Sequence, residues 1–186
     1  MSVLDVGGRY QPYRPLLRDR TARYVGLDIA QTVLVDVVGS GESLPFAANT
    51  FDVVIATQVF EFFSQPHAAA QQIHAVLKPG GCLLMSVAGF TPRIVDEEMW
   101  RFTPHGIRFS LSLFSKIEII AETFSPGGLV RAINLGLVSS SNIRFVRRTI
   151  EMGIIPLLNL FGLGFENCRF TTNDQFAPNY SVLAVK

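Results

Sequence analysis

The sequence predicts an α/β fold built on a mostly parallel, doubly wound sheet of about seven strands. First, residues 3–8 (VLDVGG) form a short apolar run that carries an acid and then opens into two glycines. Second, residues 24–28 (YVGLD) form another short strand that also ends in an acid. Third, residues 51–57 (FDVVIAT) are apolar on both faces, as expected for a buried parallel strand. Strands that alternate with helical or loop crossovers are typical of such a sheet.

The other elements follow in chain order. A valine-rich run predicts a third strand over residues 33–38. Pro66 is suited to the first position of a helix, and the helix formers after it extend this helix to residue 77. Residues 78–81 (KPGG) then predict a type II turn. The remaining predicted elements are strands over 82–87, 116–122 and 180–185 and a helix over 107–114.

Two segments depart from this alternation. Residues 90–108 are irregular and mix acids, aromatic residues, proline and histidine. Because the segment follows the carboxyl end of a strand, it predicts a lid over a substrate. Residues 126–165 form an apolar insertion, for which we predict two or three helices broken at Gly153, Pro156 and Gly162.

Length and composition predict one domain, residues 1–186, because 186 residues with 48% apolar content can bury a sizeable core. The net charge of +1 provides no basic field to collect phosphates, so we expect no nucleic-acid partner. Cys82 and Cys168 show no metal-ligand or redox spacing, and no metal site is predicted.

The first residues also bear on location and on the site. Asp5 and Arg9 interrupt the start of the chain before an apolar region develops, so we expect no secretory signal and a cytoplasmic location. The first predicted strand begins at about residue 2, with no helix before it. We therefore expect another part of the chain to cover the ligand, or the site to stay open.

The glycine turn after the first strand and the acid at the end of the second predict a nucleoside site. Glycines let the backbone approach a ligand, and a carboxylate accepts hydrogen bonds from ribose hydroxyls. Alternatively, Asp5, Gly7 and Gly8 form a tight turn in a domain that binds nothing, and Asp28 caps a helix. The offset between the two acids favours the ligand site. The first loop lacks the GxGxxG pattern, which argues against a nicotinamide-dependent oxidoreductase.

Five stretches together resemble a known family. They are residues 3–8, 24–28, 42–46 (ESLPF) with 51–54 (FDVV), 76–81 (VLKPGG) and 100–104 (WRFTP). In order and spacing they are similar to the class I S-adenosylmethionine-dependent methyltransferases, in particular to the small type 11 methyltransferase domains. The resemblance implies a Rossmann-like sheet whose last strand is antiparallel, a helical insertion before that strand, and S-adenosyl-L-methionine as cofactor.

The resemblance also implies roles for individual residues. Asp5 and Gly7 would face the methionine end of the cofactor, and Asp28 would hold the ribose diol. The loop with Gly41 and Glu42 would flank the adenine. The implied cofactor-binding set is Asp5, Gly7, Gly8, Arg9, Asp28, Ile29 (against the adenine), Gly41, Glu42, and Thr57 and Gln58 (beside the sulfonium and the ribose).

Three departures from the family pattern bear on activity. Arg9 and Gln11 occupy the second and third glycine positions of the first loop, where Arg9 could pair with the cofactor carboxylate or block the approach. Ser40 stands where the family often has an acid, and Phe62 where it often has a histidine. These departures leave two hypotheses open: an active methyltransferase, or a catalytically inactive binding or assembly module.

For the active hypothesis, we expect a small-molecule or lipid-linked methyl acceptor that enters between residues 90–108 and 126–165. Transfer from a sulfonium needs mainly positioning and desolvation, so the missing histidine does not exclude activity. His105 in the lid-like segment is the one candidate for a catalytic role, and the alternative for it is packing or capping.

The insertion also raises the question of membranes and partners. Residues 144–148 (RFVRR) are followed by mostly apolar residues 150–165, a stretch too short and too interrupted by Gly and Pro to span a bilayer. It could lie at a membrane interface, pair with a second subunit in a homo-oligomer, or close the active site. Burial or subunit pairing is the favoured interpretation at this stage.

Overall fold

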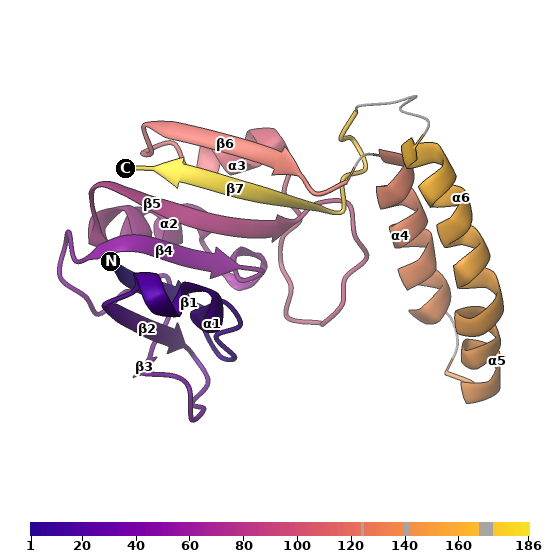
Figure 1. Ribbon diagram of the computed structural model, residues 1–186, viewed down its shortest axis with the longest axis horizontal. Coiled ribbons are helices and arrows are strands. Elements are labelled where there is room, and N and C mark those ends of the chain that lie inside the picture. Colours follow the sequence, from indigo (N-terminus) through magenta and orange to yellow (C-terminus); the bar gives the residue numbers. More distant parts are fainter. Residues whose placement is uncertain (124, 140–141, 168–172) are drawn as a thin grey trace. The chain divides into compact units, whose positions relative to one another are not determined.

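The computed structural model of the chain describes residues 1–123, 125–139, 142–167 and 173–186, so Cys168 lies outside the described residues. Its described strands form one sheet in the order β3-β2-β1-β4-β5-β7-β6 (Figure 1). The first five pair in parallel, and β7 runs antiparallel between β5 and β6. The strands are β1 (Ser2–Val6), β2 (Arg23–Asp28), β3 (Val37–Val38), β4 (Phe51–Thr57), β5 (Leu77–Ala88), β6 (Lys116–Ala121) and β7 (Asn179–Val185).

Helices cover both faces of this sheet, so the predicted doubly wound fold is confirmed. α1 lies on one face, and α2 and α3 lie on the other (Figure 1). On the side of α1, Tyr13 and Leu17 pack on the buried side chains of Val3, Tyr24 and Ile55 in the sheet. The helices of this part are α1 (Arg14–Leu17), η1 (Arg18–Arg20), η2 (Phe60–Phe62), α2 (Pro66–Val76) and α3 (Pro104–Ser110).

The register of the parallel strands sets the place of the site. Asp5 of β1 lies between Gly26 of β2 and Ile55 of β4. The carboxyl ends of these three strands therefore meet at one edge of the sheet, where ligands bind in folds of this kind. β1 is almost entirely buried, because Val3 and Leu4 are 0% exposed and Val6 is 1% exposed.

The third predicted strand is mostly wrong: of residues 33–38, only Val37 and Val38 pair with β2. Val33 is fully exposed. Asp36 instead holds the loop against β2, because its carboxylate accepts a hydrogen bond from Gly26 N (2.8 Å) and its own N–H donates to Gly26 O (2.9 Å). The β-propensity of valine yields here to a local hydrogen bond from an acidic side chain.

Two further boundaries differ from the prediction. The type II turn predicted at residues 78–81 lies inside β5, where Gly80 takes the positive φ (+76°) that such a turn requires and the register to β4 shifts. The helix predicted over 107–114 is α3 (Pro104–Ser110), which begins three residues earlier and ends four residues earlier. Thr103 caps it by accepting a hydrogen bond from Gly106 N (3.2 Å), and Pro104 takes the first position. The irregular part of the predicted lid therefore ends before α3.

The insertion contains helices, as predicted, but the predicted breaks are wrong. The helices are α4 (Ser125–Ser139), α5 (Arg144–Thr149), the π-helix η3 (Ile150–Ile154) and α6 (Ile155–Asn167). From Arg144 to Asn167 they follow one another directly: Gly153 lies within η3, and Pro156 is the second residue of α6. Gly162 is a packing residue inside α6, because a Cβ there would lie 3.3 Å from the Val130 side chain of α4.

The described chain divides into two compact units. The first comprises residues 1–87, 102–120 and 181–186, and the second comprises residues 88–101 and 121–180. Strands β5, β6 and β7 pass from one unit to the other. The residues of the implied cofactor site all belong to the first unit. That the whole chain behaves as one domain stays a prediction.

Candidate cofactor-binding site

The loop after β1 has the glycine geometry that the sequence predicts. Gly7 takes a φ of +79°, and the N–H groups of Gly7 and Gly8 both donate to Leu27 O (2.8 and 3.0 Å). A Cβ at Gly7 would lie 2.9 Å from the Val59 side chain, and a Cβ at Gly8 would lie 2.7 Å from Asp5 O. Both glycines are therefore needed to close the turn over the end of β2.

Asp5 lies beneath this loop and is 2% exposed. Its Oδ2 accepts a hydrogen bond from the Tyr24 hydroxyl (2.6 Å). Burial raises the pKa of Asp5 to about 6; the Tyr24 hydrogen bond opposes this rise, and the nearby Asp28 carboxylate adds to it. Tyr24 was not among the predicted site residues, and no motif in the sequence pairs it with Asp5. The implied role of Asp5 toward the methionine end of the cofactor stays a prediction.

Asp28 stands at the end of β2, and its side chain is 9% exposed. Its Oδ1 accepts hydrogen bonds from Ala30 N (2.8 Å) and from the Arg9 guanidinium (3.0 and 3.3 Å). Within the described part of the chain, no group donates to Oδ2, so this oxygen can accept from a ribose hydroxyl. The helix-cap alternative is wrong, because residues 29–36 form no helix. Ile29 is 74% exposed, which leaves its side chain open to an adenine ring.

Gln11 adopts a backbone conformation typical of glycine in the first loop. It has a φ of +44°, a value that L-residues other than glycine seldom adopt, and it is 3% exposed. Its amide donates to Leu34 O and accepts from Arg14 Nη1 (2.8 Å), so the side chain is held at both ends. A Cβ at Gly26 would overlap this amide. A glycine within a strand often marks a site where another group approaches the backbone closely, so Gly26 was the sequence signal that could have indicated a buried neighbour here.

The loop with Gly41 and Glu42 is fixed from two sides. A Cβ at Gly41 would lie 2.6 Å from the Phe63 ring and 2.9 Å from the Val6 side chain. Glu42 Oε1 accepts hydrogen bonds from Ser64 Oγ (2.8 Å) and Gln65 N (2.7 Å), just before α2. The carboxylate therefore braces the start of α2, and its implied role toward the cofactor stays a prediction.

Substitution of Gly41 by alanine is expected to destabilise the first unit by about 1–3 kcal/mol, because the added methyl group must displace a buried ring. Chemical denaturation monitored by circular dichroism measures this loss. Gly39→Ala is the matched control in the same loop, since a Cβ there would make ordinary contacts of 3.6 Å or more. Equal stability of the two variants would contradict the close packing at Gly41.

At the end of β4, Gln58 takes a φ of +50°. Its N–H donates to Ser86 O (2.9 Å), and its side-chain amide donates to Ser86 Oγ (3.3 Å). Thr57 is the last residue of β4 and is half-buried. The two residues thus stand at the same edge of the sheet as Gly7 and Asp28, as predicted from the strand order. Their contact with a cofactor stays a prediction.

His105 lies exposed in the first turn of α3. Among the described residues it makes no hydrogen bond, so the structure offers no group that would orient its ring. The predicted catalytic role of His105 therefore remains untested. Glu61, between the two aromatic residues of η2, is instead buried at 2% exposure and was not predicted as a site residue.

Comparison with known proteins identifies the family. Residues 4–85 match the model of the methyltransferase domain family. Over 96 residues the chain is 36% identical to malonyl-(acyl-carrier protein) O-methyltransferase 1 of Coxiella burnetii, a match that covers 48% of this chain and 34% of the relative. Over 98 residues it is 31% identical to the mitochondrial arginine-hydroxylase NDUFAF5 of Homo sapiens, covering 47% and 28%. The chain thus spans about a third of the length of these relatives.

Solved structures share the fold over the whole chain. An S-adenosylmethionine-dependent methyltransferase from Archaeoglobus fulgidus superposes with a TM-score of 0.62 at 15% identity, covering 100% of this chain and 86% of that one. Phosphoethanolamine N-methyltransferase 2 of Haemonchus contortus, solved in complex with S-adenosyl-L-methionine, gives a TM-score of 0.59 at 16% identity, covering 100% and 48%. The resemblance to the class I S-adenosylmethionine-dependent methyltransferases that the sequence motifs indicate is confirmed, because residues 4–85 match the methyltransferase domain family.

Proposed function

We propose that the chain binds S-adenosyl-L-methionine at the carboxyl ends of β1, β2 and β4 and catalyses methyl transfer to a small-molecule or lipid-linked acceptor. One observation carries this proposal. Asp28 lies beside a tight glycine turn, and its Oδ2 atom receives no hydrogen bond from the described residues. Such a carboxylate suits two vicinal ribose hydroxyls. The neighbouring exposed Ile29 suits an adenine ring.

The residues present fit the cofactor by the chemistry of their donors and acceptors. Asp28 would hold the ribose, and the loop with Gly41 would flank the adenine. The backbone near Gly7 and the residues Thr57 and Gln58 would surround the methionine end. When bound, S-adenosyl-L-methionine supplies a methyl group on a sulfonium, which leaves as a neutral thioether. The protein then has to align the acceptor and exclude water, since the charge that water stabilises disappears in the reaction.

We propose that the segment of residues 88–101 binds the methyl acceptor. Arg101 organises this segment by donating to Thr91 O (2.9 Å), Pro92 O (3.1 Å) and Trp100 O (2.8 Å) and by pairing with Glu98. Phe90 and Trp100 stay 44% and 41% exposed. Ordered, exposed aromatic residues suit an apolar acceptor.

The direct test is calorimetric titration of the purified chain with S-adenosyl-L-methionine and S-adenosylhomocysteine. We expect micromolar dissociation constants for both ligands. Methyl transfer is then measured with radiolabelled cofactor over small and acyl- or lipid-linked acceptors. Binding without transfer to any acceptor would support the inactive module, and absence of binding to either ligand would contradict the proposed site.

The ion pair between Arg9 and Asp28 is the observation that favours the second candidate, a module without catalysis. In this arrangement a guanidinium occupies the carboxylate that the ribose needs. Because the Arg9 side chain is 40% exposed, solvent screens its pairing with Asp28. An approaching cofactor can therefore displace it. The pair weakens binding modestly and does not prevent it.

Replacement of Arg9 by alanine is accordingly expected to tighten S-adenosylhomocysteine binding about two- to fivefold, because Asp28 no longer has to release its partner. Calorimetry measures the change, and Arg18→Ala, which removes an exposed arginine of the same unit, is the charge-matched control. Weaker binding of Arg9→Ala would instead mean that Arg9 swings to the carboxylate of the cofactor.

A further inference from the structure

The helices of the second unit leave a large apolar surface uncovered. α4 and α6 pack on one another, where Gly162 meets Val130 and Asn134 Nδ2 donates to Asn159 Oδ1 (2.7 Å). The side of α5, η3 and α6 away from this contact carries large side chains in water. They are Phe145 (79% exposed), Met152 (70%), Leu157 (61%), Leu160 (67%), Phe161 (67%) and Leu163 (58%), here named the apolar stripe. Stretches of this size on a surface mark an interaction site.

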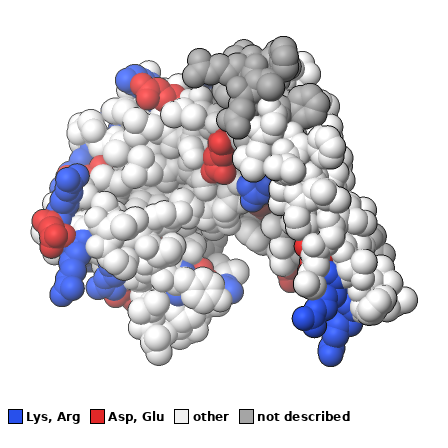
Figure 2. Space-filling view, turned by 45° about the vertical axis from the view of Figure 1, so that its right-hand side comes forward, with Lys and Arg blue, Asp and Glu red and all other residues white. Residues whose placement is uncertain are grey.

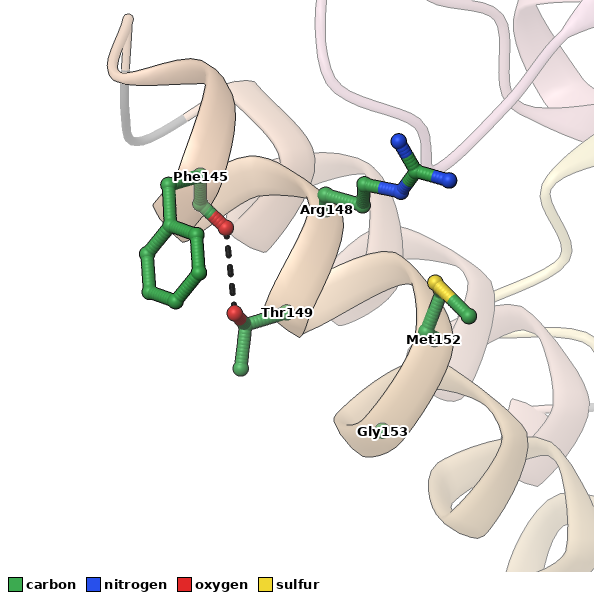
Figure 3. Close-up of a pocket in the computed structure, with 5 residues that line it drawn as sticks. All are labelled: Phe145, Arg148, Thr149, Met152 and Gly153. Carbon is green, nitrogen blue, oxygen red and sulfur yellow. Dashed lines mark hydrogen bonds between the residues drawn. The ribbon is translucent and has the colours of Figure 1, made fainter.

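An open surface pocket of about 390 Å³, here called the cavity, lies at the start of the stripe (Figure 3). Its lining residues, Phe145, Arg148, Thr149, Met152 and Gly153, all lie on α5 and η3. Their spacing of three or four residues places them on one side of a continuous helix. The Thr149 hydroxyl donates to Phe145 O (3.0 Å), so it needs no outside partner. The cavity therefore combines apolar walls with one arginine.

Positive charge accompanies the stripe at this end. Residues 125–167 contain four arginines and two glutamates, and three of the arginines stand on α5. Arg147 pairs with Glu151 (2.9 Å), whereas Arg144 and Arg148 form no ion pair among the described residues. Figure 2 shows the blue side chains gathered at the end of these helices, beside a surface that is otherwise white. A basic cluster at one end of an exposed apolar stripe is typical of helices that lie in a membrane interface.

We propose that α5, η3 and α6 dock on the surface of an anionic lipid bilayer. Phosphate head groups neutralise Arg144 and Arg148, and the large side chains of the stripe enter the boundary of the acyl chains. A second copy that covered only the stripe would leave the two arginines without counter-charges. Among the described residues, no helix is long and apolar enough to cross a membrane. The proposal is independent of cofactor binding.

The experiment is co-sedimentation of the full chain with vesicles of phosphatidylcholine alone or mixed with phosphatidylglycerol. An arginine near an anionic surface contributes about 1 kcal/mol, which is about fivefold in partition. The double variant Arg144→Gln/Arg148→Gln is therefore expected to bind mixed vesicles about thirtyfold more weakly. Arg18→Gln/Arg20→Gln, which removes two exposed arginines from the first unit, is the matched control and should bind like the wild type.

The apolar part is tested by its own variant, Phe161→Gln. Because the Phe161 side chain is 67% exposed, we expect this variant to stay folded, and thermal melting checks this point. It should lower partition into mixed vesicles about tenfold, while 1 M salt weakens the wild type strongly. No binding of the wild type to mixed vesicles at low salt would overturn the proposal. A stable dimer that Phe161→Gln converts to monomers, with no vesicle binding, would assign the stripe to a second copy.

Discussion

Replacement of Asp28 by alanine is expected to weaken S-adenosylhomocysteine binding by a hundredfold or more. Two hydrogen bonds from ribose hydroxyls to a nearly buried carboxylate would be lost, each contributing about 1.5–3 kcal/mol. The side chain is 9% exposed at the end of β2, so water replaces it poorly. Calorimetric titration of the variant and the wild type measures the loss directly.

Two further variants separate ribose binding from loop structure. Asp28→Asn can keep the hydrogen bond from Ala30 N (2.8 Å) through its amide oxygen, but it turns a donor toward the ribose. It should therefore keep the thermal stability of the wild type and still lose most of the affinity. Asp19→Ala removes an exposed acid of the same unit and should leave binding unchanged. Full affinity in Asp28→Asn would refute the assigned role.

The second large effect is a dependence of stability on pH that originates at Asp5. Its pKa is about 6 in the folded chain, above the ordinary value of 3.8, because burial penalises the charged carboxylate. The stabilising contribution of protonated Asp5 is therefore fully present below pH 3.8 and is lost as the pH rises through 6. The free energy of unfolding should fall by about 2–3 kcal/mol from this group between pH 4 and pH 7.

Asp5→Asn removes this titration while keeping a similar shape. Urea denaturation at pH 4 and pH 7 should show the advantage of the wild type over the variant shrinking as the pH rises. Asp52→Asn supplies a contrast of opposite sign. Lys78 and Ser2 hold the pKa of Asp52 below its usual range, so its contribution is present at neutral pH and lost on acidification. A constant difference between wild type and Asp5→Asn would contradict a buried, titrating Asp5.

Much of the first unit could be predicted because its central strands have a clear hydrophobic pattern. A run such as residues 51–57 is buried on both faces, and only a central parallel strand accommodates it. The prediction of a strand over residues 33–38 was mostly wrong because valines favour a strand only where a neighbouring strand pairs with them. Asp36 instead binds the backbone of β2 through its carboxylate, and residues 33–36 form no strand.

Pro156 shows why the helix breaks could not be predicted. Proline lacks an N–H and collides with the carbonyl four residues before it, which predicts an end to the helix. In η3, however, Ile155 N–H donates to Ile150 O, five residues back, and this wider turn lies directly before Pro156. No residue type or sequence pattern is specific to a π-turn, so the local sequence could not predict it.

At the site, the strand tips were predictable and the side-chain partners were not. Asp28 could be placed by its offset from the glycine turn. Its engagement with Arg9 depends on how a loop of two prolines folds back, and the pairing of Asp5 with Tyr24 depends on the register between β1 and β2. Contacts of this kind arise from long-range geometry that a single sequence does not encode as a motif.

The place of β7 in the sheet has a consequence for biosynthesis. β7 is the last of the seven described strands to be translated, yet it enters between β5 and β6. Until residues 179–185 have been synthesised, β5 and β6 lack the strand that pairs with both of them, while the apolar helices α4, α5 and α6 already precede it in the chain. Open edges and exposed apolar surface are the features that chaperones recognise in translation intermediates. Residues 179–185 can therefore join the sheet only after its six other described strands have been synthesised.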